Sequence, residues 1–331
     1  MENTAFPESL KKFSFVHYRV TLVPEDVIVM PARNKGNVLR GAFGSSLRRL
    51  VCSFDDDRSC EACPLIERCA YPGVFSPVGL IGAKRTLNAP RGYVLKPPLS
   101  TATEYTAASP LVFDMLLVGD RREYLPHVLV SLRALAATGI GVNRGRFRLG
   151  DVVSLRGDAV ETVYDASRGT VVGVGHPTSA ADLMEGLDRP GKERVTLVFL
   201  TPTRLKYNPT GERGRSAIVR KPEFHHVIRR LRDRVSALSR AYCAGPLDMD
   251  FRGLAERATG VRTVGSELRW VETARRSRTQ RTRHDQSGFV GSVTFEGGLD
   301  EFLPFLLLGE RLHVGEDATF GNGWYRVEGL A

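Results

Sequence analysis

Four of the five cysteines are crowded into a short stretch of the chain. They form a C-x7-C-x2-C-x5-C pattern, made by Cys52, Cys60, Cys63 and Cys69. Two thiolates on a tight C-x2-C turn can reach one metal ion, and the flanking chain can supply the remaining ligands. We therefore expect a structural metal site, the four-cysteine knuckle, whose positions are all filled by protein. Zinc is the first choice for this site and an iron-sulfur cluster is the second, with four reduced structural thiols as the alternative.

A cluster of arginine side chains lies between residues 269 and 283. This arginine run contains a single acid, Glu272, and its cations are interleaved with Trp270, Ser277 and Gln280. Guanidinium groups bind phosphates in bidentate fashion, and Trp270 can stack on unpaired bases, so the run favours RNA binding. A solvated loop is the alternative. The arginines expected to contact RNA are Arg269, Arg275, Arg276, Arg278, Arg281 and Arg283.

Each half of the chain also contains a glycine-rich turn. The first turn reads Gly139-x-Gly141-x3-Gly145 and the second reads Gly315-x5-Gly321-x-Gly323. Glycine lets the backbone approach a phosphate closely and offer its N–H groups, so we predict that Gly315, Gly321 and Gly323 contact RNA. Helix ends and tight turns use glycine as well, which is the alternative.

The elements that position these residues come from a repeated unit. The sequence RVTLV at Arg19–Val23 recurs at Arg194–Val198, and Ser109–Phe147 aligns without gaps on Ser287–Tyr325. In both copies a Leu-Pro pair opens an expected helix. Two matches in the same order and at nearly the same spacing indicate a duplicated domain.

Each copy has the same coarse order of elements, which is strand, helix, two strands, helix and strand. The leading strands are expected at Phe13–Val23 and Val195–Leu205. This βαββαβ order predicts an α+β protein of two tandem ferredoxin-like domains, with the four-cysteine knuckle inserted in the first. We expect the domains at residues 1–175 and 194–331, joined by a linker at 176–193 that is rich in Gly, Pro, Ser and Asp.

Two helices stand out in this pattern. The first is expected at Asn37–Val51, with Asn37 as the N-cap and with an apolar face made by Leu39, Phe43, Leu47 and Leu50. The second begins after Pro222, and its apolar residues repeat at helical spacing: Phe224, Val227, Ile228, Leu231, Val235, Leu238 and Tyr242.

A second basic band surrounds the long helix, and RNA contact and ordinary helix surface explain it equally well. Asp233 lies one turn after Arg229 and is expected to pair with it. The band consists of Arg204, Lys206, Arg213, Arg215, Arg220, Lys221, Arg229 and Arg230.

The length of the chain bears on the number of domains, and its charge bears on the class of partner. A chain of 331 residues exceeds the usual size of one domain. A net charge of +10 and a pI near 9.6 favour a polyanionic partner, either nucleic acid or a membrane surface. No apolar stretch approaches the roughly 18 residues of a membrane span, and the amino terminus lacks the order of a signal peptide. We therefore expect an intracellular protein that uses no membrane.

Four segments carry a resemblance to a known family. They are residues 39–44 (LRGAFG) ahead of the cysteines, 139–147 (GIGVNRGRF), 246–254 (PLDMDFRGL) and 312–323 (LHVGEDATFGNG). Together they resemble the CRISPR-associated endoribonucleases of the RAMP superfamily that process precursor crRNA. The resemblance covers nearly the whole chain and is closest to the cysteine-containing branch associated with type III systems.

The resemblance implies cleavage within CRISPR repeat RNA by a cytoplasmic, prokaryotic enzyme without a catalytic metal. In such enzymes the 2′-hydroxyl attacks the adjacent phosphate and leaves a 2′,3′-cyclic phosphate and a 5′-hydroxyl. The implied partners are repeat RNA, the crRNA product and a type III effector complex. The chemistry needs a base near neutral pKa and cations for the developing charge.

One position departs from the family pattern. Many relatives carry a histidine on the first helix where this chain has Ser45, and serine cannot act as a general base unaided. Ser45 shares its helix face with Gly41 and with Arg48, which we count among the RNA-binding residues. The candidate catalytic residues are therefore His284, at the end of the arginine run, and His17, on the first strand. A surface or satisfied core histidine is the alternative for each.

Two further readings stay open. A RAMP-fold subunit that holds guide RNA without cutting it would explain the missing helix histidine. A zinc-containing nucleic-acid adaptor unconnected with CRISPR is the reading from outside the family.

Overall fold

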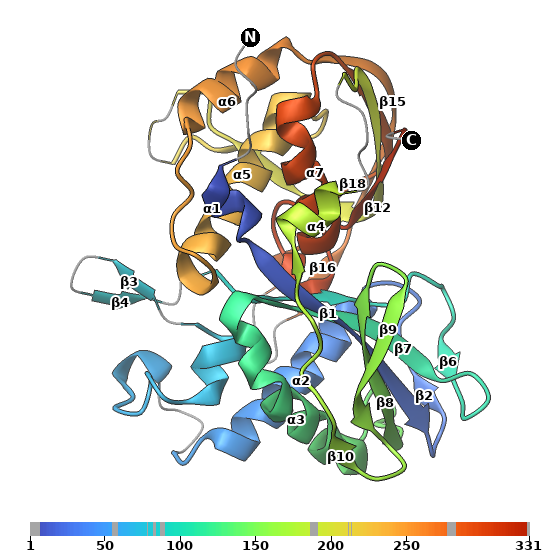
Figure 1. Cartoon of the computed structure of the whole chain (residues 1–331). Helices are drawn as coiled ribbons and strands as arrows, with labels where there is room; N and C mark the ends of the chain where they lie inside the picture. The colour runs from blue at the N-terminus through green and yellow to red at the C-terminus, as the bar shows by residue number, and fades with distance from the viewer. Residues whose placement is uncertain are drawn as a thin grey trace. The chain divides into compact units, whose positions relative to one another are not determined.

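The structure is a computed structural model, which describes residues 7–54, 59–77, 79–81, 84–86, 90–185, 191–210, 212, 214–276 and 283–329. The chain divides into two compact units (Figure 1). The N-terminal unit comprises Ser14–Thr178 and Ala241–Cys243. The C-terminal unit comprises Ser179–Arg240, Ala244–Ala331 and the residues up to Phe13.

One antiparallel sheet organises the N-terminal unit. Its strands follow the order β10-β9-β8-β1-β7-β5. The first strand lies in the middle, because it pairs with β7 on one side and with β8 on the other. The strands are β1 (Ser14–Pro24), β5 (Tyr93–Lys96), β7 (Leu111–Val118), β8 (Phe147–Arg156), β9 (Ala159–Asp165) and β10 (Thr170–Val171).

Two helices, α2 (Lys35–Val51) and α3 (Leu125–Thr138), pack on one face of this sheet. Alternate residues of β1, namely Tyr18, Val20 and Leu22, are buried in one core cluster together with side chains of both helices. Because side chains alternate along a strand, His17 and Arg19 lie on the other face of the sheet.

The first helix departs from the sequence prediction in two respects. Its N-cap is Asn34, which has a left-handed backbone with φ of 58°, so Asn37 lies inside the helix. Asparagine tolerates this conformation, which lets the helix begin earlier than predicted. Leu50 is 46% exposed, whereas Leu39, Phe43 and Leu47 are buried as predicted. Val51 packs against the core in place of Leu50.

The C-terminal unit contains a second antiparallel sheet, with the order β15-β18-β12-β19. Read from β15 to β19, this is the order β5-β7-β1-β8 of the first sheet, so both units have the ferredoxin-like arrangement predicted from the sequence. Its elements are β12 (Arg194–Thr203), α5 (Phe224–Tyr242), β15 (Arg262–Val271), β18 (Gly288–Glu296), α7 (Leu303–Leu312) and β19 (Tyr325–Glu328).

The long helix α5 follows its sequence pattern closely. All seven apolar positions from Phe224 to Tyr242 are buried. Its last two residues, Ala241 and Tyr242, belong to the N-terminal unit.

The structure confirms the duplication that the sequence indicates. In the N-terminal unit, the short helix η3 (Gly119–Tyr124) leads into α3, which carries proline in its first turn. In the C-terminal unit, η5 (Asp300–Phe302) leads into α7 in the same way. Each helix is followed by a glycine-rich turn and by the last of the four shared strands.

The predicted linker at 176–193 contains ordered elements, β11 (Thr178–Ser179) and α4 (Ala180–Met184). Ser179 and Asp182 form a capping box, in which each side chain accepts a hydrogen bond from the other residue's backbone N–H. The Ala180 N–H donates to the carbonyl of Phe13 at 2.9 Å. The segment 7–13, which includes α1 (Glu8–Lys11), therefore packs with the C-terminal unit and not within the predicted domain 1–175.

Short elements complete the two units. The two-stranded pairs are β2 (Ile28–Val29) with β6 (Glu104–Tyr105), β3 (Gly79–Ile81) with β4 (Lys84–Thr86), β13 (Leu205–Tyr207) with β14 (Ala217–Val219), and β16 (Ala274–Arg276) with β17 (Arg283–Asp285). The short helices are α6 (Phe251–Arg257), η1 (Cys60–Ala62), η2 (Tyr71–Phe75), η4 (Ala258–Gly260) and η6 (Ala318–Phe320). None of the helices in the described part of the chain is both long enough and apolar enough to span a membrane.

Two glycines of α2 allow a matched test of its packing. A Cβ atom at Gly44 would lie 2.0 Å from the Phe75 ring, whereas one at Gly41 would meet nothing within 4 Å. Gly44→Ala should therefore displace Phe75 and lower the free energy of unfolding by about 1–3 kcal/mol. Gly41→Ala should raise it by up to about 1 kcal/mol, because alanine favours a helix over glycine. Chemical denaturation measures both effects, and equal stability of the two variants would contradict this packing.

Candidate functional site

The four predicted metal ligands line one small cavity. Cys52 directly follows α2, Cys60 opens η1, Cys63 follows it, and Cys69 lies just before η2. Their cavity measures about 20 Å³, which is room for one ion or one water molecule. All four residues are free cysteines, which form no disulfide bonds.

The electrostatics of this cavity reflect the crowding of the thiols. Burial raises the pKa of the Cys60 and Cys69 thiols, and the neighbouring cysteines raise it further. Arg48 opposes this shift at Cys60, and its guanidinium lies 5.8 Å from the centre of the Tyr71 ring. Arg48, predicted to bind RNA, therefore lies beside the cysteine cavity. A cation held by the thiolates would have to displace their protons.

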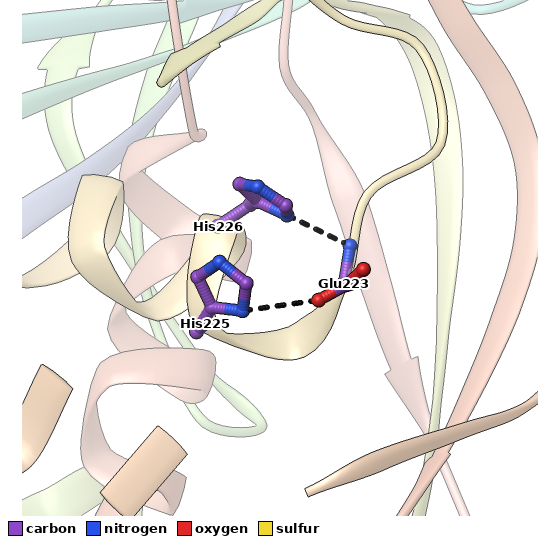
Figure 2. Close-up of side chains that lie close together, drawn as sticks. All are labelled: Glu223, His225 and His226. Carbon is purple, nitrogen blue, oxygen red and sulfur yellow. Dashed lines mark hydrogen bonds and ion pairs between the residues drawn. The ribbon is translucent and has the colours of Figure 1, made fainter. Parts of the chain in front are cut away.

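A second group of potential ligands lies at the start of α5 (Figure 2). Glu223, His225 and His226 bring ligand atoms within 4.8 Å of one another. Among the described residues only this group meets that distance, so no three of the cysteine sulfur atoms do. The cysteine loop would have to close further to hold an ion in the geometry of a zinc site.

The histidine pair has a structural explanation. His226 Nδ1 accepts a hydrogen bond from the backbone N–H of Glu223 at 3.0 Å, and His225 Nδ1 lies 3.4 Å from the Glu223 carboxylate. Burial, together with the neighbouring His225, lowers the pKa of His226 to about 4. The His226 ring is thus neutral above that pH, and its lone pair satisfies an otherwise unpaired N–H at the helix start. A metal ion bound through Nδ1 would compete with this bond. The sequence pattern did not predict this group, although two adjacent histidines follow Pro222.

His17, one of the two candidate catalytic residues, is paired with a carboxylate. Its Nε2 lies 2.9 Å from an oxygen of Asp114 on β7, and Arg19 donates to the same carboxylate at 2.9 Å. Burial raises the pKa of Asp114, but the hydrogen bonds from His17 and Arg19 outweigh burial and lower it to about 2. The carboxylate is therefore ionised at neutral pH and orients the imidazole. No local pattern in the sequence predicts Asp114 as this partner, because it reaches His17 only through the pairing of β1 with β7.

The arginine run occupies the hairpin between β15 and β18. Arg269 is exposed on β15. Arg275 and Arg276 lie on β16 and Arg283 on β17, whereas Arg278 and Arg281 lie outside the described residues. His284, the other candidate base, is exposed on β17, where it pairs with Arg275 across the hairpin.

Trp270 is less available for base stacking than the sequence predicted. The Arg220 guanidinium lies 4.5 Å from the centre of its ring, so one face of the indole is already covered by a cation. Only the opposite face remains for a base.

The second glycine-rich turn is shaped by contacts within the chain. A Cβ at Gly323 would lie 1.9 Å from the carbonyl oxygen of Val314, so only glycine fits there. The N–H groups of Gly321 and Gly323 already donate to the carbonyls of Ala318 and Pro202. These two N–H groups are therefore not free to bind a phosphate.

Gly315 lies in the same turn, with a left-handed φ of 84°. RNA contact of the three glycines stays a prediction, and at Gly321 and Gly323 it would have to use atoms other than the backbone N–H. His313 directly follows the last residue of α7, and its buried ring stacks on Trp324.

Most residues of the second basic band form ion pairs, hydrogen bonds or ring contacts within the protein. Arg204 pairs with Asp285 at 2.6 Å, and Arg230 donates to the carbonyl of Lys206. The predicted pair between Arg229 and Asp233 is wrong, because Asp233 pairs with Arg232 instead. Arg229 lies over the ring of Tyr207, with 5.6 Å between its guanidinium carbon and the ring centre.

Two family models match this chain. A family model described as an N-terminal domain matches residues 13–174, and the model of the CRISPR-associated endoribonuclease Cas6 matches residues 197–325. The second of these models names a CRISPR-associated endoribonuclease family for the C-terminal part of the chain. The C-terminal unit carries the Cas6-family domain, in agreement with the resemblance drawn from the sequence motifs. The Cas6-family match speaks against the reading as an adaptor unconnected with CRISPR.

Individual relatives are distant. The chain is 27% identical over 297 residues to an uncharacterized protein of Archaeoglobus fulgidus, which spans 88% of this chain and 91% of that one. A solved Cas6 product complex has a TM-score of 0.55 at 19% identity, covering 95% of this chain and all of the other. Cas6 of Thermus thermophilus has a TM-score of 0.51 at 18% identity, covering 96% of this chain and 99% of the other. These structures share the fold of this chain.

The arginine run, His284 and the second glycine turn lie within the Cas6-family domain. The cysteine cavity, Ser45 and His17 lie in the half matched by the other family model. Ser45 is exposed on α2.

The metal site of the four-cysteine knuckle stays a prediction, and it can be tested directly. Replacing Cys60 and Cys63 together by serine should remove one bound metal ion per chain and lower the melting temperature, because metal-binding energy is folding energy here. Cys243→Ser, which changes a thiol away from the cavity, should leave the metal content unchanged. Elemental analysis that finds neither zinc nor iron in protein purified without chelator would exclude the site.

Proposed function

We propose that this protein processes CRISPR precursor RNA by cutting within the repeat, without a metal ion. The products would carry a 2′,3′-cyclic phosphate and a 5′-hydroxyl. The observation that carries this proposal is that the arginine run lies inside the Cas6-family domain of a chain with a net charge of +10. Repeat RNA is the proposed substrate and crRNA the proposed product.

The reaction makes three demands on the protein. A base must take the proton of the attacking 2′-hydroxyl, a donor must protonate the leaving oxygen, and cations must stabilise the charge that develops on the phosphate. The arginine run would supply cations whose planar donors fit phosphate oxygens. Ser45 cannot supply the base, so the histidines have to be considered.

Two histidines are proposed for the role of base, and different observations support them. His284 extends from the same hairpin as the arginine run, which would bring it near a bound phosphate. His17 is held at 2.9 Å by the ionised Asp114 carboxylate, an arrangement that fixes the orientation of an imidazole and stabilises its protonated form.

The alternative is that the protein holds guide RNA without cutting it, as a subunit of a CRISPR effector complex such as a type III complex. The exposed Ser45 in place of a histidine favours this alternative. Incubation of the purified protein with repeat RNA in EDTA separates the two functions. Cleavage with a cyclic phosphate at the new 3′ end supports the enzyme, whereas tight binding without cleavage supports the subunit.

The candidate bases give distinct kinetic predictions. If His284 is the base, His284→Ala should slow single-turnover cleavage by roughly 10²-fold or more and leave RNA affinity nearly intact. If His17 is the base, the same result is expected for His17→Ala, and Asp114→Asn should slow cleavage as well because it removes the orienting carboxylate. Normal rates in both histidine variants would exclude both residues. In a wild-type protein that binds but does not cut, Ser45→His should restore cleavage if only the base is missing.

The arginine run should contribute phosphate contacts. Changing Arg275, Arg276 and Arg278 to alanine should weaken binding to RNAs of different sequence and flatten the salt dependence of log K by roughly 0.7 for each lost contact. Fluorescence anisotropy at several salt concentrations measures this slope. An unchanged slope would remove the arginine run from the RNA-binding surface.

A further inference from the structure

A pocket between α5 and α6 is lined by more arginines than acidic residues. It measures about 410 Å³, and it is lined by Arg229, Arg232, Phe251, Arg252, Ala255 and Glu256. All six residues belong to the C-terminal unit. Three guanidinium groups face one carboxylate, so the pocket favours an anionic ligand. Its size is that of a small-molecule site and exceeds what one bare phosphate would fill.

One of the three arginines has a structural role. Arg232 pairs with Asp233 at 2.6 Å, donates to the Phe251 carbonyl and lies 5.6 Å from the centre of the Phe251 ring. Its side chain is only 14% exposed. Arg232 therefore anchors the start of α6 to α5 and forms the fixed wall of the pocket.

The other two arginines are available to a ligand. Arg229 has no acidic partner among the described residues, and its buried Nε finds no hydrogen-bond acceptor. A buried donor without an acceptor is costly, so a ligand oxygen at this place would be bound favourably. Arg252 pairs with Glu256 at 2.8 Å, but their side chains are 90% and 61% exposed. Such an exposed pair is weak and can be exchanged for a stronger acceptor.

We propose that this α5–α6 pocket binds a phosphate of the RNA backbone through Arg229 and Arg252. The inference rests on the proposed function, because it takes the ligand to be RNA. The pocket lies in the helical layer of the C-terminal unit (Figure 1). The helix α6 leads through η4 into the start of β15, whereas the arginine run begins near the other end of that strand, at Arg269. The pocket is a second contact that extends the path of the RNA strand beyond the β15–β18 hairpin.

The test measures binding of a labelled, mixed-sequence single-stranded RNA at several salt concentrations. Arg229→Ala and Arg252→Ala should each weaken binding by about tenfold, since each removes a charge-assisted contact. Each should also flatten the salt slope by roughly 0.7. Arg229→Lys should keep the slope because it keeps the charge. Arg240→Ala removes the same charge from an exposed position elsewhere on α5, and it should leave the slope unchanged.

A change of the opposite sign excludes simple loss of folding as the cause. Glu256→Gln removes the one acid of the pocket, and it should strengthen RNA binding by about threefold. Equal effects of Arg229→Ala and Arg240→Ala, or no effect of Glu256→Gln, would overturn the pocket while leaving the proposed function intact. Saturation of the pocket by inorganic phosphate at concentrations below those that disturb RNA binding would overturn RNA as its ligand. A wild-type protein that binds no RNA would overturn both proposals.

Discussion

The central position of the first strand in each sheet is the constraint on which the candidate sites depend. β1 lies between β7 and β8, and β12 lies between β18 and β19. The pairing of β1 with β7 is what brings His17 beside Asp114. The pairing of β12 with β18 supports the strand that ends the β15–β18 hairpin and so fixes the base of the arginine run. Both strands can hold this position because one of their faces is buried in a core, which specifies the register.

The sequence predicted the fold well because the duplication gave each pattern an independent second occurrence. A single strand-helix pattern is compatible with several folds. The same order of elements in both halves is compatible with few of them. The errors concern the ends of elements. Asn37 looked like a helix cap because asparagine favours that place, yet a left-handed Asn34 starts the helix earlier. The Gly- and Pro-rich segment after residue 175 looked like a linker, although its capping box orders a short helix.

The site residues could be predicted only where the relevant contacts are local. The four cysteines lie within one short segment, so their spacing alone indicated that they share a cavity, which the structure contains. The partner of His17 lies on another strand, far away in sequence, and nothing in the chain near either residue points to the other. Helical spacing suggested that Asp233 would pair with Arg229. In the structure its adjacent neighbour Arg232 takes the carboxylate, because Arg232 is already held in place by the Phe251 carbonyl.

The pairing of Asp233 with Arg232 leaves Arg229 without an acidic partner among the described residues. Net charge alone is therefore a poor guide to an RNA-binding surface, because it does not distinguish paired from unpaired cations. Arg204, Lys206 and Arg257 all pair with acids, so their charges hold elements of the C-terminal unit together. Within the described residues, Arg229 and Arg269 have no acidic partner, and they mark the α5–α6 pocket and the arginine run. A phosphate gains most from cations of this second kind, because binding them breaks no existing ion pair. The number of positive charges in the sequence thus favours a polyanionic partner, whereas the fold distinguishes the cations that already hold elements together from those, such as Arg229, that a phosphate would bind without breaking an ion pair.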